Sequence, residues 1–195
     1  MLWLAATLPL FTPTAEAGSR WLQNDVFTGE GSAYVVARMA TDECVASLFE
    51  TDPSEYPFTF NKVQVLVLDQ NDASLTATFG VEFWSMETQS FSGALQLDEE
   101  VAQFTSSSAA YNEVTVADLE VDLPELSSAY VAVALCNAEH EGDPVIANDG
   151  SPAANTATPK TNWLYFNGRW VPAESESVTS NFIIRACIEG DSVAD

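Results

Sequence analysis

The stretch at residues 75–84 reads LTATFGVEFW and decides the fold class. Its apolar residues stand at every second position from Leu75 to Phe83, and mostly polar or small residues separate them. A period of two is typical of a β-strand that buries one face and turns the other toward water. Trp84 continues the polar series, so the alternation places its ring on the outer face of this strand.

Other parts of the chain repeat this strand pattern. Residues 117–123 and residues 181–188 alternate with the same period of two. Residues 130–136 are apolar at nearly every position, which predicts a strand that is covered on both faces.

Two segments depart from simple alternation. Residues 57–69 keep their apolar side chains on one face only if a β-bulge near Asn61 and Lys62 realigns the chain, and we predict that bulge. Residues 97–104 are the only place where we expect a short helix.

Turn residues separate the expected strands. Asn167-Gly168 gives the strongest hairpin signal, because a type I′ turn needs positive φ at both central residues. Residues 137–159 predict a surface loop with one short strand at residues 144–147. Eight to ten strands without strand–helix alternation predict an all-β fold, namely an antiparallel β-sandwich of jelly-roll type with at most one short helix.

The composition excludes several classes of protein. The 195 residues include 29 acidic and 6 basic side chains, so the formal net charge is -23. Sequence-independent nucleic-acid binding needs many Lys and Arg residues against phosphates, and binding to anionic lipid needs the same. The 47% hydrophobic content is typical of a folded domain, and no later segment is long enough to span a membrane.

The N-terminal residues 1–17 are typical of a signal peptide. An apolar run at residues 2–11 is followed by Ala15-Glu16-Ala17, a small-x-small cleavage pattern, although no Lys or Arg precedes the run. The alternative is an N-terminal strand. We therefore expect a secreted protein, extracellular or periplasmic, with one β-sandwich domain at residues 18–195.

Several short motifs together resemble a known kind of domain. The order of residues 44–49 (CVASLF), Tyr56-Pro57-Phe58, Asn162-Trp163 and residues 182–186 (FIIRA) is similar to uncharacterised β-sandwich domains of secreted bacterial proteins. The resemblance covers most of residues 31–188. It implies a jelly-roll-like sandwich with neighbouring first and last strands, used as an ancillary or surface module, and it brings no catalytic residues.

Three cysteines allow at most one intramolecular disulfide bond. If the first and last strands run antiparallel as neighbours, Cys44 lies beside Cys187, and we predict that these two form the disulfide while Cys136 is left over. The alternative is that all three are buried thiols.

The sequence gives no positive sign of an enzyme. His140 is the only histidine and lies between two glutamates in the expected loop, where we interpret it as a solvated residue. No nucleophile motif of the G-x-S-x-G kind occurs. A hydrolase that uses two carboxylates stays an alternative, because glycoside hydrolysis needs only such a pair.

One candidate cation site lies on the predicted strand at residues 117–123. Asp118, Glu120 and Asp122 share one face with neighbours roughly 6.6 Å apart along the strand. Calcium prefers such oxygen ligands, so this face is a possible calcium site. The alternative is an ordinary solvated strand face.

Four aromatic residues form a second candidate site. Trp84 lies on the outer face of its strand, and Trp163, Tyr165 and Trp170 belong to one hairpin. Exposed flat rings on a sheet suit stacking against a sugar, whereas the alternative is that they belong to the core. The sequence therefore predicts a non-enzymatic module that binds a carbohydrate or another cell-surface component, or else a structural or protein-interaction module without a small ligand.

The charge surplus predicts that salt stabilises the protein. The folded state concentrates like charges that the unfolded chain spreads apart, and the Debye length falls from about 30 Å at 0.01 M salt to about 3 Å at 1 M. Thermal melting in low and in molar sodium chloride should give a higher Tm at high salt. A Tm that stays flat or falls would contradict the repulsion argument, and a rise specific to calcium at matched ionic strength would support the face of Asp118, Glu120 and Asp122 as a cation site.

Overall fold

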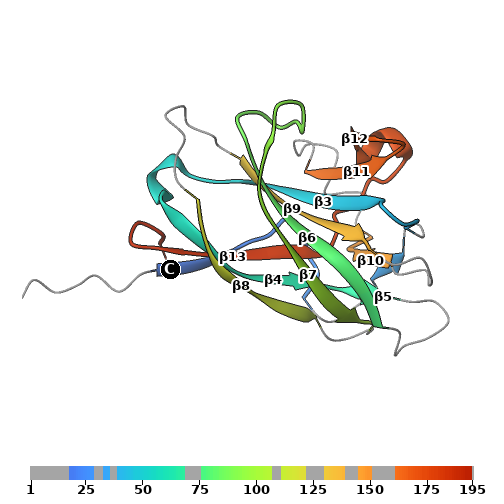
Figure 1. The fold of residues 1–195 in the computed structure, drawn as a ribbon, viewed down its shortest axis with the longest axis horizontal. Helices are drawn as coiled ribbons and strands as arrows, with labels where there is room; N and C mark the ends of the chain where they lie inside the picture. The colour runs from blue at the N-terminus through green and yellow to red at the C-terminus, as the bar shows by residue number, and fades with distance from the viewer. Residues whose placement is uncertain are drawn as a thin grey trace, which may run out of the picture.

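The computed structural model describes residues 18–28, 33–35, 39–68, 76–106, 111–121, 130–138, 145–150 and 161–194 (Figure 1). Within these ranges the chain is all-β. The strands are β1 (Gly18–Leu22), β2 (Tyr34–Val35), β3 (Cys44–Glu50), β4 (Phe58–Val65), β5 (Val67–Leu68), β6 (Thr76–Met86), β7 (Leu95–Thr105), β8 (Asn112–Val121), β9 (Tyr130–Asn137), β10 (Val145–Asn148), β11 (Asn162–Phe166), β12 (Arg169–Pro172) and β13 (Ile184–Gly190). Two 3-10 helices, η1 (Pro53–Glu55) and η2 (Ala173–Glu176), are the only helical elements described.

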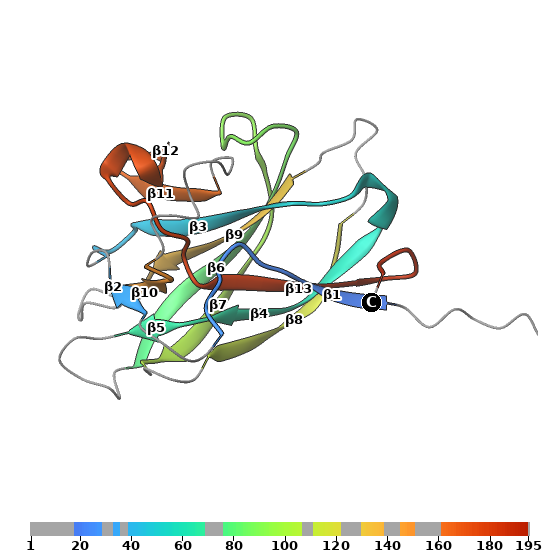
Figure 2. The same cartoon turned by 180° about the vertical axis from the view of Figure 1, so that it is seen from behind.

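The strands form antiparallel sheets that pack against each other. One sheet has the order β12-β11-β3-β9-β6-β7, a second has the order β1-β13-β4-β8, and β2-β10-β5 form a small third sheet (Figure 2). This confirms the predicted antiparallel β-sandwich, whereas the jelly-roll connectivity stays a prediction. The described strands number thirteen and not eight to ten. Strands of only two residues, such as β2 and β5, are too short to leave a periodic pattern in the sequence.

Phenylalanine rings fill the space between the two larger sheets. Phe58 and Phe60 on β4 and Phe79 and Phe83 on β6 are all buried. The rings of Phe60 and Phe83, which belong to different sheets, have centroids 5.0 Å apart. The buried face of β6 is the one that its alternation predicts.

The predicted bulge in β4 is confirmed. Cys187 of β13 pairs with Lys62, whereas the next residue, Ile188, pairs with Phe60, so Asn61 is the extra residue. The shift keeps both Phe60 and Val63 fully buried although they are three residues apart. Phase slips in an apolar series can therefore locate a bulge.

The helix predicted at residues 97–104 is wrong, because these residues belong to β7. Phe83 pairs with Asp98 and Trp84 pairs with Gln96, which leaves Leu97 as the extra residue of a second bulge. The bulge brings Leu97 and Phe104 to the core side although they are seven residues apart. Seven residues also make two helical turns, so the bulge imitates a helical pattern.

The predicted disulfide between Cys44 and Cys187 is also wrong. Cys44 lies directly opposite Cys136 in the β3–β9 ladder, and these two form the disulfide with a Cα–Cα distance of 4.0 Å. Cys187 lies on β13 in the other large sheet, where it is a buried thiol. The error came from the strand neighbours, since β13 pairs with β1 and β4 instead of β3.

Two further predictions concern the N-terminal signal peptide and the absence of a membrane span. Residues 1–17, which carry the predicted signal peptide, lie outside the described residues. Among those that are described, no helix has the length and apolar character needed to cross a membrane.

The hairpin between β11 and β12 follows the predicted turn. Asn167 has φ 51° and Gly168 has φ 76°, as the type I′ turn requires.

Replacing Gly168 by Val should lower the free energy of unfolding by about 1–3 kcal/mol, because a β-branched residue is strained at positive φ. Denaturant unfolding measures the effect, with Asn167→Gly as a control that relieves strain at the neighbouring position. Equal stabilities for Gly168→Val and the parent would contradict the turn geometry.

Candidate functional site

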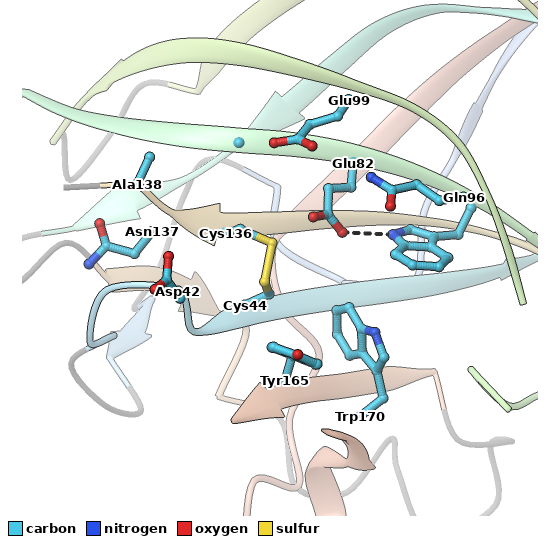
Figure 3. A pocket seen from close by; sticks show the side chains of 12 residues that line it. Asp42, Cys44, Glu82, Gln96, Glu99, Cys136, Asn137, Ala138, Tyr165 and Trp170 are labelled. Carbon is cyan, nitrogen blue, oxygen red and sulfur yellow. Dashed lines mark hydrogen bonds between the residues drawn. A yellow bond between two sulfur atoms is a disulfide. The ribbon is translucent and has the colours of Figure 1, made fainter. Parts of the chain in front are cut away.

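A pocket of about 380 Å³ lies on the outer face of the six-stranded sheet (Figure 3). Its centre follows one row of directly paired residues across five strands. The row consists of Gly80 on β6, Cys136 on β9, Cys44 on β3, Tyr165 on β11 and Trp170 on β12. Small side chains in the middle of the row and large rings at its end leave a hollow whose volume is within the range of small-molecule sites.

The floor of the pocket is the Cys44–Cys136 disulfide together with Gly80. A Cβ atom at Gly80 would lie 3.2 Å from Oε1 of Glu99 and 3.8 Å from Cβ of Cys136. The missing side chain therefore keeps open the space between the disulfide and the carboxylate of Glu99.

Three of the four predicted aromatic residues line this pocket. Trp84, Tyr165 and Trp170 come from β6, β11 and β12, and the ring centroids of Trp84 and Trp170 are 6.2 Å apart. Tyr165 and Trp170 are directly opposite each other, with centroids 5.3 Å apart. All three are partly buried, so each keeps part of its surface accessible to a ligand.

The fourth aromatic residue, Trp163, is buried and lies outside the pocket lining. It packs against Phe91, and Phe91 in turn stacks on Trp170 with centroids 3.9 Å apart. Phe91 therefore packs between the buried Trp163 and the ring of Trp170. The core alternative therefore holds for Trp163, whereas a sugar platform of Trp84, Tyr165 and Trp170 stays a prediction.

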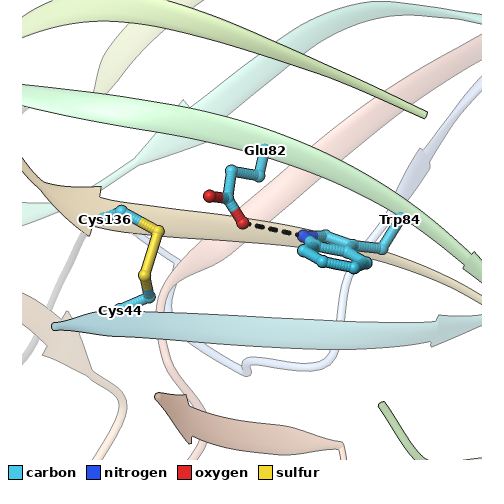
Figure 4. The surroundings of a disulfide bond; sticks show 4 residues. All are labelled: Cys44, Glu82, Trp84 and Cys136. Carbon is cyan, nitrogen blue, oxygen red and sulfur yellow. Dashed lines mark hydrogen bonds between the residues drawn. A yellow bond between two sulfur atoms is a disulfide. The ribbon is translucent and has the colours of Figure 1, made fainter. Parts of the chain in front are cut away.

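Carboxylates form the other side of the pocket. Glu82 and Glu99 are directly opposite each other on β6 and β7, and Asp42 lies in the turn before β3. Nε1 of Trp84 donates a hydrogen bond of 2.9 Å to Oε2 of Glu82, which orients this carboxylate (Figure 4). Burial raises the pKa of Glu82, the Trp84 hydrogen bond lowers it, and the charge of Glu99 raises it further, with a net upward shift.

The charge of the pocket is entirely negative. None of its lining residues is Lys, Arg or His. Three basic side chains of the described part of the chain are paired elsewhere: Arg20 with Glu55, Lys62 with Glu113 and Arg185 with Asp25. The pocket therefore repels anions and suits neutral or positively charged ligands.

The predicted calcium face and the single histidine are not placed in this pocket. Residues 118 and 120 belong to β8, but their side chains and the whole of Asp122 lie outside the described residues, as does His140. The calcium site on Asp118, Glu120 and Asp122 stays a prediction.

Sequence reasoning missed the polar half of the pocket, although part of its signal is local. Gly80, Glu82 and Trp84 alternate along β6, so they share its outer face. Glu99 reaches the pocket because β7 pairs with β6, and Asp42 reaches it from the turn before β3. The sequence pattern does not show which strands are neighbours, so these two residues could not be predicted.

Comparison of the chain with protein-family models, curated proteins and solved structures finds no match.

Replacing Glu82 by Gln should stabilise the protein at neutral pH. A carboxyl with a raised folded-state pKa contributes stability that is present at low pH and is lost as the pH rises through that pKa. Gln cannot ionise, yet its oxygen can still accept the Trp84 hydrogen bond. The gain in unfolding free energy should therefore be present at pH 7 and shrink as the pH falls toward 4.

Glu87→Gln is the control for this experiment. Glu87 is exposed in the segment after β6, so its replacement changes the net charge by the same amount without changing a half-buried carboxylate. Denaturant unfolding at several pH values gives the change in unfolding free energy for each variant. If that change follows the same pH dependence in both variants, the half-buried environment of Glu82 has no effect on stability.

Proposed function

We propose that this protein is a secreted, non-enzymatic β-sandwich binding module that holds a carbohydrate in the pocket of Trp84, Tyr165 and Trp170. The observation that carries the proposal is the combination of three partly exposed rings with carboxylates around one hollow. Rings can pack against the apolar face of a sugar, and carboxylate oxygens can accept hydrogen bonds from its hydroxyl groups. Secretion is supported by the signal-peptide pattern of residues 1–17 and by the disulfide, because disulfides persist mainly outside the reducing cytoplasm.

The negative pocket also bears on which sugars would bind. Glu82, Glu99 and Asp42 would repel the carboxylate of a uronic acid or the sulfate of a sulfated sugar. We therefore expect neutral sugars and amino sugars to bind, and acidic sugars to bind weakly or not at all.

Titration of intrinsic tryptophan fluorescence with neutral, amino and acidic oligosaccharides tests this function. Trp170→Ala should weaken binding by about tenfold or more, because buried aromatic anchors dominate the energy of binding sites. Trp21→Ala is the matched control, since Trp21 is an exposed tryptophan on β1 in the other large sheet.

A second variant separates loss of binding from damage to the fold, because Trp170 also stacks on Phe91. Gly80→Ala adds one methyl group to the pocket floor within a regular strand and leaves the aromatic residues intact. It should weaken binding with little change in Tm. The proposal is wrong if no oligosaccharide binds, or if Trp170→Ala and Trp21→Ala bind equally well.

A hydrolase is the second candidate function, and one observation favours it. Glu82 and Glu99 share a pocket but differ in environment, since Glu82 is half-buried with a raised pKa and Glu99 is exposed. Two carboxylates in unlike environments can divide the acid and base roles of glycoside hydrolysis. Release of reducing ends from an oligosaccharide, abolished by both Glu82→Gln and Glu99→Gln, would establish this activity in place of simple binding.

A further inference from the structure

We propose that reduction of the Cys44–Cys136 disulfide creates a binding site for a thiophilic divalent metal ion such as Zn²⁺, with Cys44, Cys136 and Glu82 as its three protein ligands. This site lies in the floor of the pocket and does not depend on carbohydrate binding. Its thiolate ligands differ in chemistry from the carboxylates of the calcium face predicted on Asp118, Glu120 and Asp122.

The three side chains already converge on one point. The two sulfur atoms and a carboxylate oxygen of Glu82 all lie within 4.8 Å of one another. Tetrahedral zinc has Zn–S distances of about 2.3 Å and Zn–O distances of about 2.0–2.2 Å, so its ligand atoms are roughly 3–4 Å apart. Small side-chain rotations would therefore bring freed sulfurs and the carboxylate to coordinating distance.

The ligands come from three adjacent strands of one sheet. Cys44 and Cys136 face each other across β3 and β9, and Glu82 lies two residues along β6 from Gly80, the partner of Cys136. The β3–β9 ladder pairs seven residues on each strand, and β9 is buried on both faces. A core of this size does not need a disulfide in order to fold, so the strands should hold the ligands in register after reduction.

The surroundings of Glu82 suit a metal ligand. The hydrogen bond from Trp84 holds one oxygen of the carboxylate, which is the way in which neighbouring groups commonly orient ligands. Glu99 and Asp42 add negative charge around the pocket, which favours a cation. The fourth coordination position would face the open pocket, where water could occupy it.

The ligand set selects the class of metal. Thiolates prefer zinc, cadmium and other soft or borderline ions, whereas calcium and magnesium prefer oxygen ligands alone. In the oxidised protein the sulfurs are bonded to each other, so they cannot act as thiolate ligands.

A phosphine can serve as the reductant of the Cys44–Cys136 disulfide. The phosphine gives two electrons to the disulfide, the S–S bond breaks, and water supplies the oxygen of the phosphine oxide and the two protons of the new thiols. Metal binding then releases those two protons to the solvent, because thiolates are the ligands.

Cobalt binding to the full chain tests the proposal, since Co²⁺ bound to thiolates has an intense near-ultraviolet absorption that carboxylate-bound Co²⁺ lacks. The chain is reduced with a phosphine, which does not compete for metal as a dithiol does, and is titrated with Co²⁺. We expect one equivalent of Co²⁺ with the thiolate band, displaced by Zn²⁺. The oxidised chain should show no such band.

Four variants identify the ligands. Cys187→Ser should bind like the parent, because Cys187 is a buried thiol in the other large sheet. The double variant Cys44→Ser/Cys136→Ser should lose the thiolate band. Glu82→Gln should bind at least about tenfold more weakly, since even loss of an outer partner of a metal ligand costs about 10- to 100-fold. Glu87→Gln, with the same change in net charge, should bind like the parent.

Three results would overturn the proposal. One is a thiolate band in the double serine variant, and another is unchanged affinity in Glu82→Gln. The third is loss of the far-ultraviolet circular dichroism of the parent on reduction, because the site requires the paired strands.

Discussion

The pocket depends on the register in which β9 pairs with its two neighbours. Cys136 lies opposite both Cys44 of β3 and Gly80 of β6, and this alignment sets three small residues side by side on the outer face. If one strand slipped by one residue in either ladder, every outward side chain of that strand would move to the opposite face of the sheet. The disulfide fixes one of these two ladders covalently, so the same bond that closes the floor of the pocket also maintains the row of residues that forms it.

The two faces of β9 pack against different clusters of side chains. Val131, Val133 and Leu135 pack into the main core between the sheets, whereas Ala132 and Ala134 face outward. The alanines leave room for Phe91 and Trp163 to lie on the sheet, and these rings support Trp170 at the edge of the pocket. The small outer side chains of a central strand thus allow an aromatic layer outside the core, and the aromatic wall of the pocket belongs to that layer.

Sequence periodicity predicted the strands well where only local patterns matter. The alternation in β6 and the phase slip at Asn61 gave the buried face and the bulge correctly. In β7 it failed, because the bulge at Leu97 produced a spacing that a helix would also produce. The aromatic cluster around Trp163 and Trp170 could not be inferred from their hairpin, since it includes Phe91 from a distant segment.

Pairing between strands far apart in the sequence explains the wrong disulfide prediction and also the negative charge of the site. The disulfide prediction depended on which strands are neighbours, and no local pattern shows that β3 lies between β11 and β9. The same sheet order places Glu99 opposite Glu82, an arrangement of like charges that is unfavourable in a strand pair. The fold tolerates this pair although Glu82 is half-buried, whereas the basic side chains Arg20, Lys62 and Arg185 neutralise acids elsewhere. The pocket lining holds Asp42, Glu82 and Glu99 but no basic residue that could neutralise them, so a neutral or cationic ligand would meet their negative charge there.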